Sequence, residues 1–241
     1  MLVPRTYDMH TKAWRYVSFS RFTWLLQRKR IWMARVDKLD DEWELALAGD
    51  QLKHVYATAP IRPLDEPPPK ETVEERTKRI IDMWRRETFV SCWCASNHES
   101  HALWRIFCGP SEGVAIQSTL AALKQEFQNI PLYDIRYEHP GKKQSTPVKL
   151  DLATIKRPMF SYEHEVRFIA EPDHNNPNLC KGEFGFEYDI EPEKFIEKIV
   201  IHPQADESFM ETVMLLIDGL APTLRDQVQW SEMRGKPPLG Q

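Results

Sequence analysis

The chain has 241 residues, of which 41% are hydrophobic and 28% are charged. This composition is typical of a globular protein with a substantial core, and it excludes collagen-like, mucin-like and wholly disordered chains. The formal net charge of −4 argues against a general coat for nucleic acids, although it permits a local basic patch.

Several common site types are absent from the sequence. It contains neither the phosphate-binding pattern G-x-x-x-x-G-K-[ST] nor the dinucleotide pattern G-x-G-x-x-G, so the two commonest nucleotide-binding folds have no support. No window approaches the ~20 apolar residues of a membrane-spanning helix. The first residues also lack the apolar run of a signal peptide. We therefore expect a cytoplasmic protein with no membrane partner.

The four cysteines are too few for a disulfide scaffold in a chain of this length, so reduced thiols are expected. Cys92, Cys94, His98 and His101 are residue types that bind metals, but their spacing does not match a standard zinc site. We expect buried free thiols here and no metal.

The first third of the chain predicts a strand, a helix and a second strand. Residues 14–17 are aromatic and β-branched, which favours a strand. Ser18 or Ser20 can then cap a helix whose apolar residues recur at spacings of three and four. Residues 31–34 predict the next strand, and the five prolines of residues 60–69 predict a loop.

A helix is predicted over residues 71–86, where an acidic first turn and a basic last turn match the helix dipole. The later predictions are strands at 89–93, 113–116, 132–137, 166–169, 184–188, 198–201 and 228–230, and helices at 100–107, 120–127 and 207–220. Because strands and helices do not alternate strictly, we expect an α+β fold with mixed or antiparallel sheets and flanking helices. We interpret residues 1–11 as an N-terminal extension, 12–233 as one domain and 234–241 as a tail.

Two places near strand and helix starts carry residues suited to binding. Arg15 offers a planar fork for a phosphate or carboxylate beside the aromatic Tyr16, whereas the alternative is a surface arginine next to a core tyrosine. Glu99 faces a cleft in one interpretation. In the other, Ser100 simply caps a helix and Trp104 belongs to the core.

A third place is a pair of acids in the second half of the chain. In a strand, Glu163, Glu165 and Arg167 share one face. Two carboxylates on one face raise each other's pKa unless a cation separates them, and Arg157 or Arg167 can do so. Such a pair can act as a general base, an electrostatic clamp or a metal ligand. The alternative is a solvated face held by salt bridges.

Several blocks of the sequence, in their order and spacing, resemble the bacterial domain of unknown function 2971 family. They are residues 14–18 with 37–44, residues 89–104 with 113–116, and residues 156–167. The resemblance spans about residues 12–230. The departures are Trp14 for a usual tyrosine, Trp43 where proline is frequent, and Phe107 for a common tyrosine. Membership in this family implies no activity.

A more distant similarity carries a mechanism. A first strand with arginine beside an aromatic residue, then a short helix, and a late strand with glutamate resemble the ADP-ribosyltransferase fold. In the arginine-type branch, the resemblance implies that Arg15 and Ser91 form the NAD site and that Glu163 and Glu165 form the Glu-x-Glu pair. Cys92 and Trp93 follow Ser91, where that branch has a Ser-Thr-Ser triplet.

The resemblance implies NAD as cofactor and cleavage of its nicotinamide–ribose bond through an oxocarbenium-like state. Its roles for single residues are as follows: Glu165 stabilises the cation, Glu163 orients or deprotonates the acceptor, Arg15 pairs with the pyrophosphate, Ser91 fixes the active-site strands, and Tyr16 or Trp93 stacks on nicotinamide. We also expect Glu99, Lys156 and Arg167 to contact substrate. The partner would be NAD or another anionic small molecule, with nucleic acid as one acceptor.

Two alternatives stay open beside this NAD-using effector, which we interpret as a toxin or phage-defence component. In a metal-dependent nuclease, acidic residues would gather around Mg²⁺ with Lys156 near the scissile phosphate; these acids are Asp40, Asp41, Glu44, Glu163 and Glu165. In a non-catalytic module, Arg15, Arg21, Arg28 and Arg35 would bind an anionic ligand. The sequence leaves the oligomeric state open.

Overall fold

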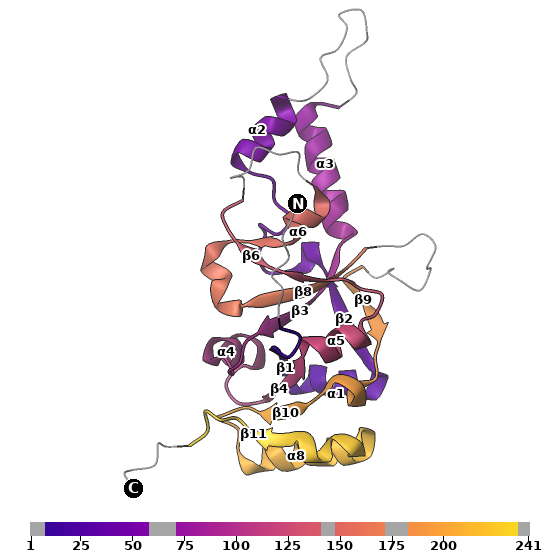
Figure 1. The fold of residues 1–241 in the computed structure, drawn as a ribbon, viewed down its shortest axis with the longest axis vertical. Coiled ribbons are helices and arrows are strands. Elements are labelled where there is room, and N and C mark those ends of the chain that lie inside the picture. Colours follow the sequence, from indigo (N-terminus) through magenta and orange to yellow (C-terminus); the bar gives the residue numbers. More distant parts are fainter. Residues whose placement is uncertain (1–7, 58–70, 141–147, 172–182, 236–241) are drawn as a thin grey trace, which may run out of the picture.

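The structure is a computed structural model and describes residues 8–57, 71–140, 148–171 and 183–235. A nine-stranded mixed sheet runs through the molecule (Figure 1). Its strands are β1 (Lys12–Ser18), β2 (Arg30–Arg35), β3 (Phe89–Ala95), β4 (Gly113–Thr119), β5 (Leu132–Asp134), β8 (Glu165–Ala170), β9 (Gly185–Asp189), β10 (Lys198–Ile201) and β11 (Val228–Trp230). A small second sheet pairs β6 (Arg136–Tyr137) with β7 (Ile155–Lys156).

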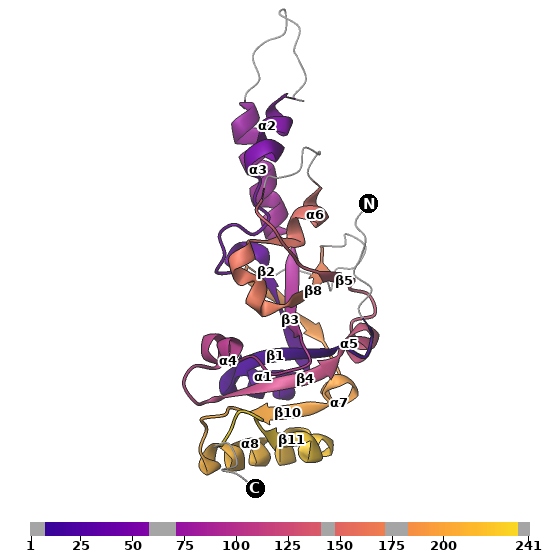
Figure 2. The ribbon, with the colours of Figure 1, turned by 60° about the vertical axis from the view of Figure 1, so that its left-hand side comes forward.

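Helices lie on both faces of the large sheet and at its two ends (Figures 1 and 2). The α-helices are α1 (Phe19–Arg28), α2 (Gly49–Ala57), α3 (Val73–Arg86), α4 (His101–Cys108), α5 (Leu120–Glu126), α6 (Lys149–Ala153), α7 (Pro192–Phe195) and α8 (Glu207–Leu220), with short 3₁₀ segments η1 (Val36–Lys38), η2 (Pro158–Glu163) and η3 (Pro222–Gln227). Helix α8 covers one end beside β10 and β11, whereas α2 and α3 project from the opposite end. No described helix is both long and apolar enough to cross a membrane.

The predicted α+β class with mixed sheets and flanking helices is confirmed. The described strand pairs are antiparallel except β10 with β11 and β6 with β7. The first helix begins where its cap was predicted, because the Ser18 hydroxyl accepts from the Arg21 amide. Helix α3 begins with a complete capping box between Thr72 and Glu75. The loop predicted for residues 60–69 lies outside the described residues.

Two strand predictions were wrong in detail. The single strand predicted for residues 132–137 is two short strands in different sheets, because the chain leaves β8 at Ile135 and Arg136 donates to the Thr154 carbonyl instead. Glu163 was predicted to lie within a strand, but it ends η2, and β8 begins only at Glu165. Helix α2 was not predicted.

Strand β3 changes neighbours along one edge. It pairs with β2 at Phe89 and Val90 and with β1 at Cys94 and Ala95, whereas β8 pairs with it along most of its other edge. Residues 91–93 therefore pair with neither β1 nor β2, and we call this opening the seam. Unpaired strand edges need other hydrogen-bond partners.

The side chain of Arg15 fills the seam. Its guanidinium donates to the Ser91 hydroxyl and to the carbonyl of Trp32, the latter at 3.2 Å. It also lies 5.6 Å from the centre of the Trp93 ring. Burial lowers the pKa of Arg15 to about 10, which still leaves the guanidinium charged at neutral pH. Arg15 thus joins β1, β2 and β3 where the backbone ladder is interrupted.

The two faces of the sheet bury different side chains. One face carries the main core, to which Trp93, Val166 and Phe168 belong. The other face is divided between a cluster that includes Cys94 and α4 residues and a cluster that includes Val90, Ile169 and residues of α3 and α6. Successive residues of a strand point to opposite faces, so the face on which a side chain lies follows from these clusters.

Gly113 allows the end of α4 to pack closely on the start of β4. A Cβ atom at this position would overlap Cβ and Sγ of Cys108, whereas a Cβ at Gly219 in α8 would meet nothing within 4 Å. We expect Gly113→Ala to lower the free energy of unfolding by about 1–3 kcal/mol through overpacking. The control Gly219→Ala should be neutral or stabilising by up to about 1 kcal/mol. Denaturant unfolding measures both, and equal effects would contradict this packing.

Candidate functional site

A buried guanidinium lies at the start of β8, between two glutamates. The side chain of Arg167 is only 1% exposed. Its Nη1 and Nη2 donate to the two carboxylate oxygens of Glu44 at 2.7 and 2.5 Å, and its Nε donates to Glu165 at 2.5 Å. Nη1 also donates to the carbonyl of Ala153 at 3.2 Å. Such bidentate, charge-assisted contacts fix the planes of all three groups.

Lys156 extends this cluster toward the surface. Its ammonium donates to Glu165 at 3.1 Å and also to Glu163. Glu163 is the more accessible acid, since its side chain is 15% exposed and that of Glu165 only 5%. We call Glu44, Lys156, Glu163, Glu165 and Arg167 the carboxylate centre. Three elements contribute its outer part: β7 carries Lys156, η2 ends at Glu163, and β8 begins at Glu165.

The backbone is strained on both sides of the centre. His164, between the two acids, has φ of 43°, and the buried Leu45, next to Glu44, has φ of 54°. Bulky residues rarely adopt such left-handed conformations, and each costs about 1–3 kcal/mol. The turn at His164 is the reason why Glu163 leaves the strand and still reaches Lys156. The hydroxyl of Tyr137 also accepts from the Glu165 amide at 2.7 Å, which fixes the start of β8.

The two acids of the centre differ in protonation. Burial opposes ionisation of Glu165, but the charges of Arg167 and Lys156 outweigh burial and hold its pKa below the ordinary value. Burial raises the pKa of Glu163 to about 7, a shift that Lys156 opposes and Glu165 reinforces. Environments that separate the pKa values of neighbouring acids assign them different roles. Glu165 is a fixed anion, and Glu163 can exchange a proton near neutral pH.

The carboxylate centre contains one more acid than it contains cations, and Glu163 is its outermost acid. Three carboxylates, of Glu44, Glu163 and Glu165, face two cations, Lys156 and Arg167. When Glu163 is protonated the two anions and two cations balance, and when it ionises the centre has a net charge of −1. Glu163, the acid whose charge changes near neutral pH, is also the acid of the centre that is nearest to solvent. A cation that forms beside Glu163 would be stabilised electrostatically.

A loop between β2 and α2 closes the centre from one side. Arg157 donates to Asp41 at 2.7 Å, and the side chain of Asp41 is only 4% exposed. The guanidinium of Arg157 lies 5.5 Å from the centres of the Trp43 and Phe160 rings. Lys156 lies 4.8 Å from the same Phe160 ring. An aromatic and cationic stack thus continues from the loop to the carboxylate centre.

The structure does not bring the predicted NAD-binding residues to this centre. Ser91 pairs with Phe168, whereas Glu165 pairs with Cys94, and the two pairs lie on opposite faces of the sheet. Arg15 contacts Ser91 and so belongs to the opposite face. Trp93 is buried in the main core, with its ring edge-on to that of Phe195. The roles of these residues toward NAD stay predictions.

Tyr16 and Glu99 make structural contacts around α4. The hydroxyl of Tyr16 accepts from the Ser100 amide at 2.7 Å, and its ring packs edge-on against Trp104. Both oxygens of Glu99 are occupied, one by the indole of Trp104 and the hydroxyl of Ser231, the other by the backbone amide of residue 232. Glu99 therefore fastens the end of the described chain to α4.

The nuclease hypothesis requires the acidic residues to bind a metal ion, but in the structure they bind arginine side chains. Glu44 and Glu165 share Arg167, and Asp41 is bound by Arg157. Within the described residues, no group of three histidine, cysteine or acidic side chains is placed to hold a metal ion. Cys92, Cys94 and Cys108 are free thiols. Burial raises the pKa values of Cys94 and Cys108 to about 12, so neither is a ready thiolate ligand.

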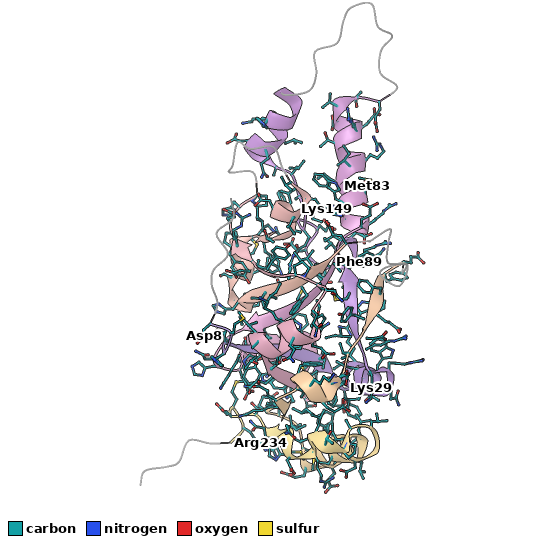
Figure 3. The ribbon with its side chains drawn as sticks, turned by 45° about the vertical axis from the view of Figure 1, so that its right-hand side comes forward. Asp8, Lys29, Met83, Phe89, Lys149 and Arg234 are labelled. Carbon is teal, nitrogen blue, oxygen red and sulfur yellow. The ribbon has the colours of Figure 1, made fainter. Side chains whose placement is uncertain are left out.

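The binding-module alternative also lacks a shared site. Of the four arginines proposed for it, Arg15 occupies the seam, and Arg35 is bound by both oxygens of Asp37. Arg21 and Arg28 are exposed on α1. A hollow beside α3, the helix on which Figure 3 labels Met83, is lined mostly by charged residues and includes no member of the carboxylate centre.

No family model matches the chain, so membership in the domain of unknown function 2971 family stays a prediction. No curated protein matches it either. Among solved structures, DarT from Thermus sp. 2.9, in complex with ADP-ribosylated single-stranded DNA, aligns with a TM-score of 0.41 and 11% identity. The alignment covers 96% of this chain and 98% of DarT. At this distance the likeness carries no functional inference.

Some residues of the site were not singled out from the sequence. Trp43 and Phe160 were not predicted to contact a charged group, and Tyr137 was assigned only to a strand. A signal was present for Trp43, which stands between acids in a segment rich in charge. A large aromatic residue flanked on both sides by acids favours an exposed position for its ring.

We expect loss of Arg167 to be severely destabilising. The variant Arg167→Met leaves Glu44 and Glu165 buried without their cation, and unpaired buried charges typically cost 3–5 kcal/mol. The control Arg30→Met breaks an exposed contact of the same kind, to Glu187 and Asp189, and should leave the unfolding midpoint nearly unchanged. Thermal and denaturant unfolding test the pair. Similar midpoints for the two variants would contradict the role of Arg167.

We expect Glu163 to titrate near neutral pH. Carbon-13 spectra of glutamate carboxyls should show one signal with a pKa of about 7, against an ordinary value of 4.5, and Glu163→Gln should remove that signal. The folded state holds this proton more tightly than the unfolded chain does. The free energy of unfolding should therefore fall as the pH rises from 4.5 to about 7. The variant should lack this fall, and the exposed Glu211→Gln should keep it. A signal that survives in Glu163→Gln would contradict the assignment.

Proposed function

We propose that this protein is an enzyme that cleaves the nicotinamide–ribose bond of NAD and transfers ADP-ribose to an acceptor. The observation that supports it best is the carboxylate centre, in which a fixed anion, Glu165, stands behind a titratable one, Glu163. A Glu-x-Glu pair at Glu163 and Glu165 is also what the sequence resemblance to ADP-ribosyltransferases implies, although that resemblance gives the stabilisation of the cation to Glu165, and the geometry here favours Glu163 for it because Glu163 is the more accessible acid. A mono-ADP-ribosylating toxin fits these features.

The bond cleavage creates positive charge on the ribose. As nicotinamide departs from C1′, the ring passes through an oxocarbenium-like state, as in glycoside hydrolysis. An ionised Glu163 next to that ribose supplies the unit of negative charge that the cation lacks in solution. Glu165 and Lys156 hold Glu163 in place, so their contribution is to its position and charge. In this proposal Glu163 touches the reacting atoms and Glu165 is a positioning residue.

The acceptor step also uses Glu163. A nucleophilic acceptor that attacks C1′ must lose a proton, and a carboxylate with a pKa near the working pH is suited to receive it. NAD would bind as the substrate that supplies ADP-ribose. Lys156 belongs to the carboxylate centre and Arg157 is the next residue of the chain, so in this proposal these two cations contact the phosphates of NAD. The roles predicted for Arg15 and Ser91 require a ligand on the other face of the sheet.

The first test is nicotinamide release from NAD by the purified protein, with cell extract added as a source of acceptors. We expect Glu163→Gln to lower the rate by about 100-fold or more, the cost of removing a transition-state electrostatic partner. The rate of the wild-type protein should rise with pH through about 7 and then level off, because Glu163 must be ionised. Glu165→Gln should also slow release.

The control is Glu211→Gln, an exposed substitution on α8 that should leave the rate unchanged. No nicotinamide release under any condition, together with no shift of the unfolding midpoint by NAD, would overturn the proposal. Full activity of folded Glu163→Gln would overturn the role of the carboxylate centre.

A further inference from the structure

Tyr137 supplies a hydrogen-bond partner at the point where the pairing of β8 stops. Strand β5 pairs with β8 as far as Asp134 opposite Val166, one residue short of Glu165. There the hydroxyl of Tyr137 accepts from the Glu165 amide at 2.7 Å, in the place of a backbone carbonyl. Glu165 is buried, and a buried N–H group requires a partner. The first residue of β8 is therefore completed by a side chain.

Both backbone groups of Glu165 are held by one short segment. The Glu165 carbonyl accepts from the Ile135 amide at 3.2 Å, and its amide donates to Tyr137, two residues further along that segment. Glu165 follows the left-handed His164, at which the chain turns to present Glu163. The backbone on the strand side of this turn thus depends on the segment that carries Tyr137.

The same segment is tied to Lys156. Tyr137 lies opposite Lys156 in the parallel pair of β6 with β7. The amide of the next residue, Glu138, donates to the Lys156 carbonyl at 3.0 Å. The ammonium of Lys156 in turn contacts Glu163. Tyr137 is therefore a second link, besides Lys156 itself, between the small sheet that carries the cation and the turn that carries the acid.

The hydroxyl of Tyr137 stays neutral while the acid beside it changes charge. Burial raises the pKa of Tyr137, and the charges of Glu165 and Glu163 act in the same direction. The phenol therefore keeps its proton throughout the range in which Glu163 titrates. Its bond to the Glu165 amide is a fixed support that does not itself respond to pH in this range.

Two charged groups decide how readily Glu163 ionises. The titratable groups around it are Lys156 on β7, Glu165 on β8, Cys94 on β3 and its neighbour Tyr162. Burial raises the pKa of Cys94 to about 12 and raises that of Tyr162 as well, so both stay neutral near pH 7. Once burial of Glu163 is given, its charge depends on how close Lys156 and Glu165 lie.

We infer that Tyr137 is a positioning residue of the proposed reaction, whose hydroxyl fixes the turn at His164 so that Lys156 stays in contact with Glu163. The inference rests on the proposed function, in which ionised Glu163 stabilises the ribose cation. Without the hydroxyl the turn and the small sheet separate, while the ring of a phenylalanine still covers the acids. Glu163 then keeps its burial, loses part of the attraction of Lys156 and ionises at a higher pH.

Carbon-13 titration of the glutamate carboxyls tests this without any substrate. Tyr137→Phe should raise the pKa of Glu163 from about 7 by about one unit, the change expected when an opposite charge leaves close contact. The matched control is Tyr16→Phe, because the Tyr16 hydroxyl also accepts from a backbone amide, that of Ser100, at 2.7 Å. This control should leave the pKa of Glu163 unchanged. An unchanged pKa in folded Tyr137→Phe, or equal shifts in the two variants, would overturn the inference.

A double-mutant cycle tests whether Tyr137 acts through Lys156. Lys156→Met alone should raise the pKa of Glu163, because Lys156 opposes the effect of burial. Tyr137→Phe added to Lys156→Met should then cause no further shift, since the contact that Tyr137 supports is already absent. Shifts that add in the double variant would overturn the inference.

The pH profile of nicotinamide release distinguishes positioning from a general loss of structure. A rise of one unit leaves about 5-fold less ionised Glu163 at pH 7 and almost as much as in the wild type at a pH of about 9.5. Tyr137→Phe should therefore release nicotinamide about 5-fold more slowly at pH 7 and at nearly the wild-type rate at the higher pH. An equal loss of rate at both pH values would overturn the inference.

The two measurements also separate this inference from the proposed function. A raised pKa of Glu163 in Tyr137→Phe, with no nicotinamide release by the wild-type protein, would overturn the enzymatic proposal and leave Tyr137 as the residue that positions Glu163. Nicotinamide release with the same pH profile in wild type and Tyr137→Phe would overturn the role of Tyr137 and leave the NAD-cleaving enzyme.

Discussion

The guanidinium of Arg167 is almost completely buried, and it contacts three separate segments of the chain. It binds Glu44 from the loop after β2, Glu165 from the start of β8 and a carbonyl at the end of α6. A charge in this position is tolerable only while its carboxylates remain in place. Burial of Glu44 and Glu165 is likewise tolerable only while Arg167 neutralises their charges. Folding of the loop and of the strand start is therefore coupled to this one side chain.

This coupling explains how a strained and charged site persists at the surface. Because Arg167 and Lys156 fix Glu165, the chain can turn through the left-handed His164 and present Glu163 outward. The same network holds the loop that presents Trp43 next to Arg157. Backbone strain of this kind persists where surrounding contacts over-determine the conformation. The same network of charged side chains therefore holds both Glu163, which titrates near neutral pH, and the exposed ring of Trp43.

Much of the fold follows from local signals. Ser18 and Ser100 accept from the amides of their helices as caps do, and the strands predicted at 198–201 and 228–230 have those bounds. The site follows less well, because it depends on strand register. Glu165 pairs with Cys94, three residues from Ser91, and an odd offset places two residues on opposite faces. The sequence of a single strand does not reveal which residues of a neighbouring strand it pairs with. The left-handed turn at His164 was also not predicted, because no glycine marks it.

The face on which NAD lies decides between the carboxylate centre and the predicted Arg15–Ser91 site. A crystal structure with a non-hydrolysable NAD analogue measures this directly. We expect the nicotinamide-side ribose to lie on the Glu165 face of β3 and β8, with a hydroxyl or C1′ within contact distance of the Glu163 carboxylate. An analogue bound in the seam against Arg15 and Ser91, with its ribose away from Glu163, would contradict the assignment of the carboxylate centre as the site of bond cleavage.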